Sequence, residues 1–355
     1  MNQINVLSLF DGISCGRLAL NKANIPINKY YASEINEYSI KVAKKNFPDT
    51  IELGDVRNLK KENINNKIDL LIGGSPCQSF SFIGHMDGMS TTENGIQKDI
   101  LTLEEYLDAK NKGFKFNGFS YLFWEYVRIL KEVNPQYFLL ENVNMTKKWE
   151  KVITNALGVE PIRINSSLLS AQNRKRLYWT NLPIKGTPED SNILLKSIFV
   201  TEDNHENVGD ALTVQRSLPK LQKKYGYIPK MFNAYNSTEI IDKSPTLSLG
   251  SMVTSSCATT IFVKDEKFGC YSVKNNKINI NNFEYDTKLE DGKYILRKLT
   301  PVECERLQNL PDNYTNGVSD SQRYKMIGNG WTVNVIEWLF SHYPKEEGEI
   351  WVLNE

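Results

Sequence analysis

The sequence predicts an α/β fold: a mostly parallel sheet with helices on both faces, accompanied by a smaller domain that is mostly irregular or β-structured. Two observations predict the sheet. Short apolar runs alternate with amphipathic segments in the first part of the chain, and an acid or a cysteine directly follows several of these runs. A third observation predicts the second domain. From Asn181 onward Ser, Thr and Asn become more frequent, and short β-like runs replace the alternation.

Composition bounds the class of protein. The chain has 355 residues, 40% of them hydrophobic, which suits a large domain and a smaller one. No apolar run approaches the ~20 residues of a membrane span, and no signal peptide is visible. The five cysteines lack paired spacing, which favours a reducing cytoplasm over a disulfide framework or a zinc site. The net charge of +1 neither requires nor excludes nucleic acid, and abundant Lys, Asn and Ile are typical of AT-rich bacterial or phage genomes.

The first element reads as a strand, a glycine-containing turn and a helix. Residues 5–10 are predicted as a buried strand, residues 11–16 as the turn, and the helix continues to about Ala23. This order opens many nucleotide-binding domains. The turn is not a GxGxxG motif, so no pyrophosphate cradle is implied, and an ordinary strand-to-helix turn explains it equally well.

Two acids follow the next strands. Residues 30–33 are predicted as a strand that ends at Glu34, and Asn36 caps a helix that runs to Asn46. Asp55 follows at another strand-to-loop junction. Either acid alone is typical of a solvated surface, but a carboxylate at such a position also accepts hydrogen bonds from ribose hydroxyls. Together they favour an adenosine pocket without phosphates, and S-adenosylmethionine fits that description.

A cysteine then stands where a sheet would place a nucleophile. Residues 68–72 read as a buried strand, which Gly73, Gly74 and Pro76 stop just before Cys77. Cysteine is the most nucleophilic side chain near neutral pH. The alternative, a small buried hydrophobic residue, is the commoner role of a single cysteine.

After Cys77, a long segment with little periodicity is followed by a clear helix and a clear strand. Residues 84–117 show no strong period apart from a short helix within 99–112, which is typical of a lid or binding loop. A helix over 121–133 and a strand over 137–140 come next, and Glu141 directly follows that strand. Cys77 and Glu141 are therefore expected at one sheet edge as a catalytic pair.

Beyond a strand at 162–165, the order of the motifs becomes specific. The chain resembles the cytosine-C5 DNA methyltransferases of bacteria and phages, with some similarity to the catalytic domain of the vertebrate de novo type. The matching stretches, in the family's order, are Leu9-Phe10-Asp11-Gly12, Ser75-Pro76-Cys77-Gln78, Glu141-Asn142-Val143, Gln172-Asn173-Arg174-Lys175-Arg176, residues 297–308 and Ile327-Gly328-Asn329-Gly330-Trp331.

The resemblance implies a Rossmann-like, S-adenosylmethionine-dependent DNA (cytosine-5-)-methyltransferase with a known reaction. The target cytosine is flipped out of double-stranded DNA, the Cys77 thiolate adds to C6, and C5 then takes the methyl group, leaving S-adenosylhomocysteine. Glu141 would hydrogen-bond N3 and the exocyclic amine of the base. Arg174 and Arg176 would hold the base and the adjacent phosphate, although a basic run is also typical of a solvated face.

The resemblance also implies the binding residues. The cofactor-binding positions are Phe10, Asp11, Gly12, Ile13, Gly16, Glu34, Ile35, Asp55, Val56, Pro76, Asn329 and Trp331. The DNA-binding positions are Gln78, Ser79, Ser81, Gln172 and Arg174. No metal is implied. The last motif departs from the family's usual Gly-Asn-Ser, which makes the contacts of Asn329 and Trp331 uncertain.

The resemblance divides the chain in function. Residues 1–180 and 297–355 would form the catalytic domain, and residues 181–296 the target-recognition domain. Within the latter, the basic and aromatic run 216–230 is suited to a phosphate backbone or equally to a solvated helix face. Residues 300–303 carry a helix-start signature in which Thr300 is the cap.

Two other functions stay open at this point. One is a tRNA cytosine-C5 methyltransferase of the family's RNA-directed branch, although the long recognition segment favours DNA. The other is a catalytically silent binding protein, although such proteins lose the cysteine or the Glu-Asn-Val motif. We expect a cytoplasmic monomer that binds double-stranded DNA and no membrane. A solitary enzyme and one that accompanies a cognate restriction endonuclease both fit the sequence.

Overall fold

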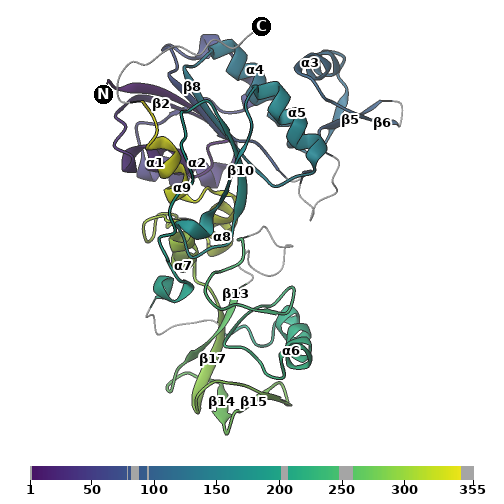
Figure 1. Ribbon diagram of the computed structural model, residues 1–355, viewed down its shortest axis with the longest axis vertical. Helices are drawn as coiled ribbons and strands as arrows, with labels where there is room; N and C mark the ends of the chain where they lie inside the picture. Colours follow the sequence, from purple (N-terminus) through teal and green to yellow (C-terminus); the bar gives the residue numbers. More distant parts are fainter. Residues whose placement is uncertain are drawn as a thin grey trace. The chain divides into compact units, whose positions relative to one another are not determined.

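The structure is a computed structural model that describes residues 2–77, 79–80, 88–93, 96–200, 207–247 and 259–344. The chain divides into two compact units, and Figure 1 labels many of their helices and strands. The first unit comprises Met1–Asn165, Lys175–Pro188 and Val333–Glu355, and the second comprises Ser166–Arg174 and Glu189–Thr332. Among the described residues, no helix has the length and apolar character needed to cross a membrane.

A seven-stranded sheet lies at the centre of the first unit, in the order β3-β2-β1-β4-β8-β10-β9 among the described residues. Neighbours from β3 to β8 pair in parallel, and β10 runs antiparallel to β8 and β9. Its strands are β1 (Ile4–Leu9), β2 (Ile27–Ser33), β3 (Ile51–Glu52), β4 (Leu70–Gly74), β8 (Tyr137–Val143), β9 (Ile162–Asn165) and β10 (Lys175–Thr180). The predicted mostly parallel sheet is confirmed.

The register of the strands separates two faces. Leu7 pairs with Tyr31 and lies in the apolar core under the helices α4 (Phe123–Val133) and α5 (Lys147–Leu157). Val6 pairs with Tyr30, whose ring lies 5.2 Å from the guanidinium of Arg17 in helix α1 (Cys15–Lys22). Because successive strand residues face opposite sides, helices cover both faces, as predicted.

Local signals place two further helices of this unit. Helix α2 (Glu37–Asn46) begins where predicted, because the Asn36 side chain accepts a hydrogen bond of 3.0 Å from the Ser39 backbone N–H. Helix α9 (Val333–Phe340) returns from the far end of the chain to pack against α1, and the Lys22 ammonium lies 3.0 Å from the Glu337 carboxylate.

A small module follows the Cys77 region in the chain, and we call its described residues, 88–93 and 96–117, the α3 module. It contains helix α3 (Leu103–Asn111), within the range in which a short helix was expected. It also contains an antiparallel sheet in the order β6-β5-β7, which the sequence did not predict. These strands are β5 (Ser90–Glu93), β6 (Ile96–Asp99) and β7 (Lys115–Asn117).

The second unit is built around an antiparallel sheet in the order β12-β11-β13-β17-β14-β15-β16. Its strands are β11 (Met231–Asn233), β12 (Thr238–Glu239), β13 (Thr259–Lys264), β14 (Tyr271–Lys274), β15 (Lys277–Ile280), β16 (Phe283–Asp286) and β17 (Gly292–Lys298). Helix α6 (Leu212–Tyr225) shares an apolar core with this sheet through Val214, Leu218 and Leu221. The β-structured second region is thus confirmed.

Two short helices complete the second unit. Helix α7 (Pro301–Leu307) has the predicted capping box, in which the Thr300 hydroxyl accepts from the Glu303 backbone N–H. Helix α8 (Asp320–Asn329) follows, and the Gln308 side chain donates to the Ile327 carbonyl at 3.0 Å. Residues 297–332 therefore belong to this compact unit, whereas the sequence grouped them with the catalytic domain. The two compact units therefore have other boundaries than the predicted functional domains, and the functional division stays a prediction.

Candidate active site

The carboxyl ends of β4 and β8 lie next to each other, and we call this part of the first unit the β4–β8 edge. Gly74 pairs with Glu141, so the turn that carries Cys77 leaves β4 beside the Glu141 backbone. Gly73 is needed in this strand, because a Cβ atom there would lie 3.0 Å from the Leu9 carbonyl oxygen and 3.0 Å from the Tyr126 ring. The backbone before the cysteine is therefore tightly packed, as a fixed nucleophile requires.

The residue after Glu141 ties the two strand ends together. Asn142 is 1% exposed, and its side-chain N–H groups donate to the Ser75 hydroxyl at 3.0 Å and to the Ser75 carbonyl at 3.2 Å. The Phe80 backbone N–H donates to the Cys77 carbonyl at 3.0 Å, which closes the turn on its other side. The Cys77 residue itself is half-buried. Asn142 belongs to the Glu141-Asn142-Val143 motif, but no separate role was predicted for its side chain from the sequence.

Arg176 joins the same edge from the antiparallel strand. Because β10 runs opposite to β8, its first residues lie beside the last residues of β8, and Tyr178 pairs with Glu141. The Arg176 Nε atom lies 2.9 Å from Glu141 Oε1, and the two side chains are only 13% and 12% exposed. The structure therefore brings together two of the four residues expected to be catalytic in a directly observed ion pair, with Cys77 on the adjoining turn.

Arg174, the fourth, has a different setting from the one expected. It is 4% exposed and donates to backbone carbonyls of the second unit: Leu247 at 3.3 Å, Gly328 at 3.2 Å and Gly330 at 3.0 Å. A guanidinium with three carbonyl acceptors supports the fold around residues 328–330. Its expected contacts with the base and the phosphate stay a prediction.

The other expected DNA contacts are placed in part. Gln172 is buried, where its side chain donates to the Leu307 carbonyl at 3.4 Å and accepts from the Leu247 backbone N–H at 3.2 Å. Ser79 is also buried, and its backbone N–H donates to the Ser120 hydroxyl at 3.1 Å. Gln78 and Ser81 lie outside the described residues.

The expected cofactor residues of the first unit follow β1, β2 and β3, and we call this part the β1–β3 edge. Phe10 and Gly12 have φ values of 57° and 59° in the turn after β1, and a Cβ atom on Gly12 would meet nothing within 4 Å. Glu34 holds this turn, because its carboxylate accepts from the Gly12 backbone N–H at 2.9 Å. It also accepts from the backbone N–H groups of Ile35, at 2.7 Å, and Asn36, at 2.8 Å.

Asp11, in the same turn, has hydroxyl partners. Its carboxylate accepts from the Tyr30 hydroxyl at 2.7 Å and from the Ser14 hydroxyl. Burial raises the pKa of the Asp11 carboxyl, although hydrogen bonds from Ser14, Ser8 and Tyr30 oppose that change. Asp11 therefore supports the turn through these hydrogen bonds, and the cofactor contact expected of it stays a prediction.

Asp55 caps the turn after β3 and is held by a neighbour. The Asp55 carboxylate accepts from the Arg57 backbone N–H at 2.9 Å and forms an ion pair of 2.5 Å with the Arg57 guanidinium. These hydrogen bonds lower the pKa of Asp55. Ile35, in contrast, leaves an apolar side chain 70% exposed at the same edge. Of the other residues expected to bind the cofactor, Ile13, Gly16 and Val56 are buried, and Pro76 is half-buried.

Glu52 also lies at this edge, although no role was predicted for it from the sequence. Both of its carboxylate oxygens are buried without a hydrogen-bond partner among the described residues. Burial raises its pKa to about 7, and the charges of Asp11 and Glu34 add to that effect. No sequence signal marks it, because a glutamate at the end of a short strand is usually solvated.

The last two expected cofactor residues belong to the second unit. Asn329 is exposed at the end of α8, and Trp331 is half-buried just beyond it. Whether they close the cofactor pocket stays a prediction. The described residues contain no group of three or more His, Cys, Asp or Glu side chains that could hold a metal ion.

The chain matches known proteins along most of its length. A family model described as C-5 cytosine-specific DNA methylase matches residues 4–106 and 107–345. The chain is 26% identical to a type II methyltransferase, M1.ScrFI of Lactococcus lactis subsp. cremoris, over 93% of this chain and 75% of that protein. It is also 26% identical to the orphan methyltransferase M.SPBetaI of Bacillus phage SPbeta, over 98% of this chain and 100% of that protein.

Solved structures share the fold. The methyltransferase EhMeth of Entamoeba histolytica aligns with a TM-score of 0.62 at 14% identity, over 97% of this chain and 100% of that one. A DNMT2 variant of Spodoptera frugiperda aligns with a TM-score of 0.61 at 19% identity, over 96% and 99% of the two chains. These likenesses confirm the α/β methyltransferase fold.

Proposed function

Because the chain belongs to the C-5 cytosine-specific DNA methylase family, we propose that it methylates C5 of a flipped-out cytosine in a specific double-stranded DNA sequence. The methyl donor is S-adenosylmethionine, and the reaction passes through a transient bond between Cys77 and C6 of the ring. One observation supports this proposal most strongly. Glu141, whose ion pair with Arg176 spans 2.9 Å, lies on β8 beside β4, the strand that leads to Cys77. Asn142, the next residue of β8, hydrogen-bonds Ser75 in the turn before Cys77.

The chemistry assigned to these residues follows from the electronics of cytosine. C5 of the neutral ring is a poor nucleophile. When the Cys77 thiolate forms a bond to C6, electron density moves onto the ring and C5 becomes nucleophilic. Glu141 hydrogen-bonds N3 and the exocyclic amine, and it supplies a proton at N3 as negative charge develops there.

The remaining bonds are then made and broken in order. C5 forms a bond to the methyl carbon as the carbon–sulfur bond of the donor breaks. The C5 proton then leaves to solvent, and its electron pair forms the C5–C6 double bond. The Cys77–C6 bond breaks with its electron pair on sulfur, and N3 returns its proton to Glu141, which restores the aromatic ring. Arg176 keeps the Glu141 carboxylate oriented through these steps by its ion pair. A fixed carboxylate needs no reorganisation while the reaction proceeds.

The β1–β3 edge fits a donor that has an adenosine and no phosphates. Glu34 and Asp55 offer carboxylate oxygens to the ribose hydroxyls and the adenine amine, and the exposed Ile35 side chain offers an apolar surface. The carboxylates of Glu34 and Asp55 would repel a pyrophosphate. When bound, S-adenosylmethionine supplies an electrophilic methyl group on a cationic sulfur. The Phe10–Gly12 turn would hold its methionine part.

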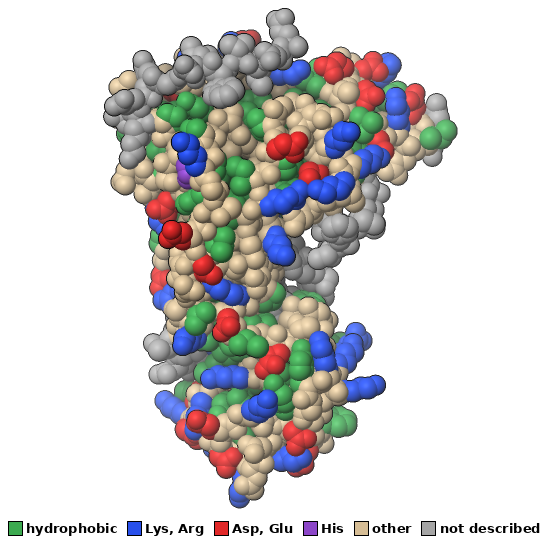
Figure 2. Space-filling view, in the orientation of Figure 1, with side chains coloured by type: hydrophobic (Ala, Val, Ile, Leu, Met, Phe, Trp, Pro, Cys, Tyr) green, Lys and Arg blue, Asp and Glu red, His purple; other side chains and the backbone are tan. Residues whose placement is uncertain are grey.

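The second unit would contribute the reading of the DNA sequence. Arg216, Lys220, Lys223 and Lys224 all lie on the exposed side of α6, opposite the apolar side in the core. Figure 2 shows Lys and Arg side chains in blue over the part of this unit where α6 lies. Such a face suits phosphates, while base edges in the major groove would be read by other residues of 181–296.

Bisulfite sequencing of DNA from cells that express the chain tests this function and shows the target sequence at once. We expect one short sequence motif to be protected at C5, and no protection when Cys77→Ser is expressed. Tritiated methyl incorporation into purified duplex DNA and into tRNA is the second arm. Labelling of tRNA alone would replace the proposal with the RNA-directed reaction, and labelling of neither would contradict it.

A further inference from the structure

A buried carboxylate outside the reaction site joins the α3 module to the long helix α4. Glu125 is 0% exposed and lies in α4. It accepts from the Tyr106 hydroxyl, from the Lys110 ammonium at 2.5 Å and from Arg128 Nε at 2.6 Å. Two of these three donors come from α3. A buried acid with three donors is stable only while its partners stay in place, because a buried charge without partners is costly.

Arg128 extends this network to the turn that carries Asp55. Its Nη2 atom donates to the Val56 carbonyl at 3.0 Å and to the Leu59 carbonyl at 2.9 Å. Its Nε atom donates to Glu125, and its Nη1 atom donates to Glu132 at 2.6 Å. A planar guanidinium is suited to hold several acceptors in fixed directions at once. The 55–59 turn therefore takes its shape from a side chain that Glu125 orients.

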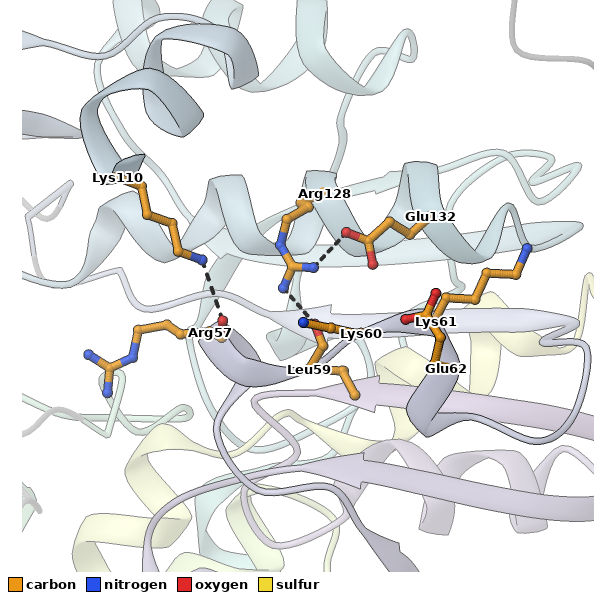
Figure 3. A pocket seen from close by; sticks show the side chains of 8 residues that line it. All are labelled: Arg57, Leu59, Lys60, Lys61, Glu62, Lys110, Arg128 and Glu132. Atoms are coloured by element: carbon orange, nitrogen blue, oxygen red, sulfur yellow. Dashed lines mark hydrogen bonds and ion pairs between the residues drawn. The ribbon is translucent and has the colours of Figure 1, made fainter. Parts of the chain in front are cut away.

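The α3 module also contacts this turn directly. The Lys110 ammonium donates to the Arg57 carbonyl at 3.4 Å, and the Arg57 side chain in turn holds Asp55. Figure 3 shows Lys110 and Arg128 directed from α3 and α4 toward the backbone of the 57–60 segment. A cavity of about 370 Å³ remains at this seam. Five cationic side chains and two acids line it, and three of the cations, Arg57, Lys110 and Arg128, are already in ion pairs with carboxylates.

We propose that the α3 module is a positioning element of the cofactor pocket: through Glu125 and Arg128 it fixes the turn from which Asp55 meets the adenine. This inference rests on the proposed use of S-adenosylmethionine. It adds that a module placed just after the Cys77 region is linked in energy to cofactor binding. Since such a link is reciprocal, cofactor binding must also stabilise α3.

The test is the dissociation constant of S-adenosylhomocysteine, measured by calorimetry on the full chain at a temperature at which circular dichroism shows each variant folded. Arg128→Met removes both carbonyl contacts, and we expect its dissociation constant to rise about tenfold while kcat at saturating cofactor changes by less than about twofold. Arg128→Lys keeps the positive charge, and its dissociation constant should lie between those of the wild type and Arg128→Met. Joint replacement, Tyr106→Phe with Lys110→Met, should raise the constant severalfold.

Two matched controls keep the result specific. Lys112→Met removes an exposed ion pair with Asp108 at the end of the same helix α3. Glu132→Gln removes only the outer partner of Arg128. Neither should change the dissociation constant. A folded Arg128→Met variant that binds as tightly as the wild type would overturn the inference, as would a kcat loss with unchanged binding.

A second measurement needs no variant. Amide hydrogen exchange of Leu103–Asn111 in the wild-type chain should slow severalfold when S-adenosylhomocysteine is added, because α3 and the ligand stabilise each other. Unchanged exchange at saturating ligand would overturn the inference even if the variants fail to fold. If the wild type binds no S-adenosylhomocysteine at all, the proposed function fails instead, so the two failures are distinguishable.

Discussion

The β4–β8 edge and the β1–β3 edge belong to one sheet but treat their acids differently. At the first, Glu141 has a direct ion pair with Arg176 from the neighbouring strand. At the second, Asp55 also has an ion pair, with its half-exposed neighbour Arg57, but Glu34 is held by backbone N–H groups and Glu52 has no hydrogen-bond partner among the described residues. The difference indicates two tasks. A paired, oriented carboxylate suits proton and charge control on a ring, whereas acids with spare acceptor capacity suit a ligand that brings its own donors.

The largest expected effect lies at the nucleophile. Replacing Cys77→Ser should lower kcat on duplex DNA by roughly 10³-fold or more, because a serine hydroxyl is a far weaker nucleophile than a thiolate. Binding of S-adenosylhomocysteine should stay within about twofold, since the change leaves the β1–β3 edge intact. Methyl-transfer kinetics and calorimetry on the same preparation check both. A serine variant with near-native turnover would remove Cys77 from the reaction.

The ion pair at the same edge comes next. Arg176→Met should lower kcat by about 10²-fold, because Glu141 would lose the cation that orients it. The matched control is Arg163→Met on the adjacent strand β9, which removes an ion pair of 2.5 Å with Glu150 from a half-exposed side chain. Single-turnover rates separate the two. Equal rates in both variants would show that the pair at Glu141 has no special role.

A substitution at the β1–β3 edge should weaken cofactor binding and leave the rate of the chemical step unchanged. Glu34→Ala removes the acceptor of the Gly12 N–H and the expected partner of the ribose, so the dissociation constant of S-adenosylmethionine should rise roughly tenfold. Glu37→Ala, an exposed acid in the first turn of α2, is the control. Unchanged affinity in the Glu34 variant would remove this residue from the pocket.

The smallest expected effect is a pH dependence of stability. The folded state raises the pKa of Glu52 from 4.5 to about 7, so its ionisation opposes folding. Its contribution to stability is fully present below pH 4.5 and is lost as pH rises to about 7. The free energy of unfolding of Glu52→Gln, relative to that of the wild type, should therefore be about 1 kcal/mol higher at pH 8 than at pH 4, after allowance for partial exposure.

Denaturant titration at the two pH values measures this difference. The expected change is a stabilisation of the Glu52→Gln variant that grows with pH. A difference that does not depend on pH would show that the Glu52 carboxyl titrates normally, and the contrast between the two edges would lose this part of its support.

Local signals made part of this architecture predictable. The strand ends at Gly74 and Glu141 follow apolar runs of strand length, and the helix starts at Asn36 and Thr300 depend on residues within three positions. These elements are determined by neighbours in the chain. For the same reason the edge that carries Cys77 and Glu141 could be proposed from sequence.

Long-range contacts were not predictable. Arg174 donates to the carbonyls of residues 73, 154 and 156 positions away, contacts that no local pattern encodes, and its expected contact with the base stays a prediction. The strands of the α3 module were missed because β6, Ile96–Asp99, is short and largely exposed. The raised pKa of Glu52 depends on burial and on the charge of Asp11, which lies elsewhere in the chain, so no local pattern predicts it.

The central claim is that a cysteine sulfur bonds to the pyrimidine while the methyl group moves. The most direct measurement is denaturing gel and intact-mass analysis after incubation with S-adenosylmethionine and duplex DNA that carries 5-fluorocytosine at the confirmed target position, since fluorine cannot leave as a cation. We expect a stable species with the summed mass of protein, DNA and one methyl group, and none with Cys77→Ser. Absence of this species at a position that the wild type methylates when it carries cytosine would contradict the account.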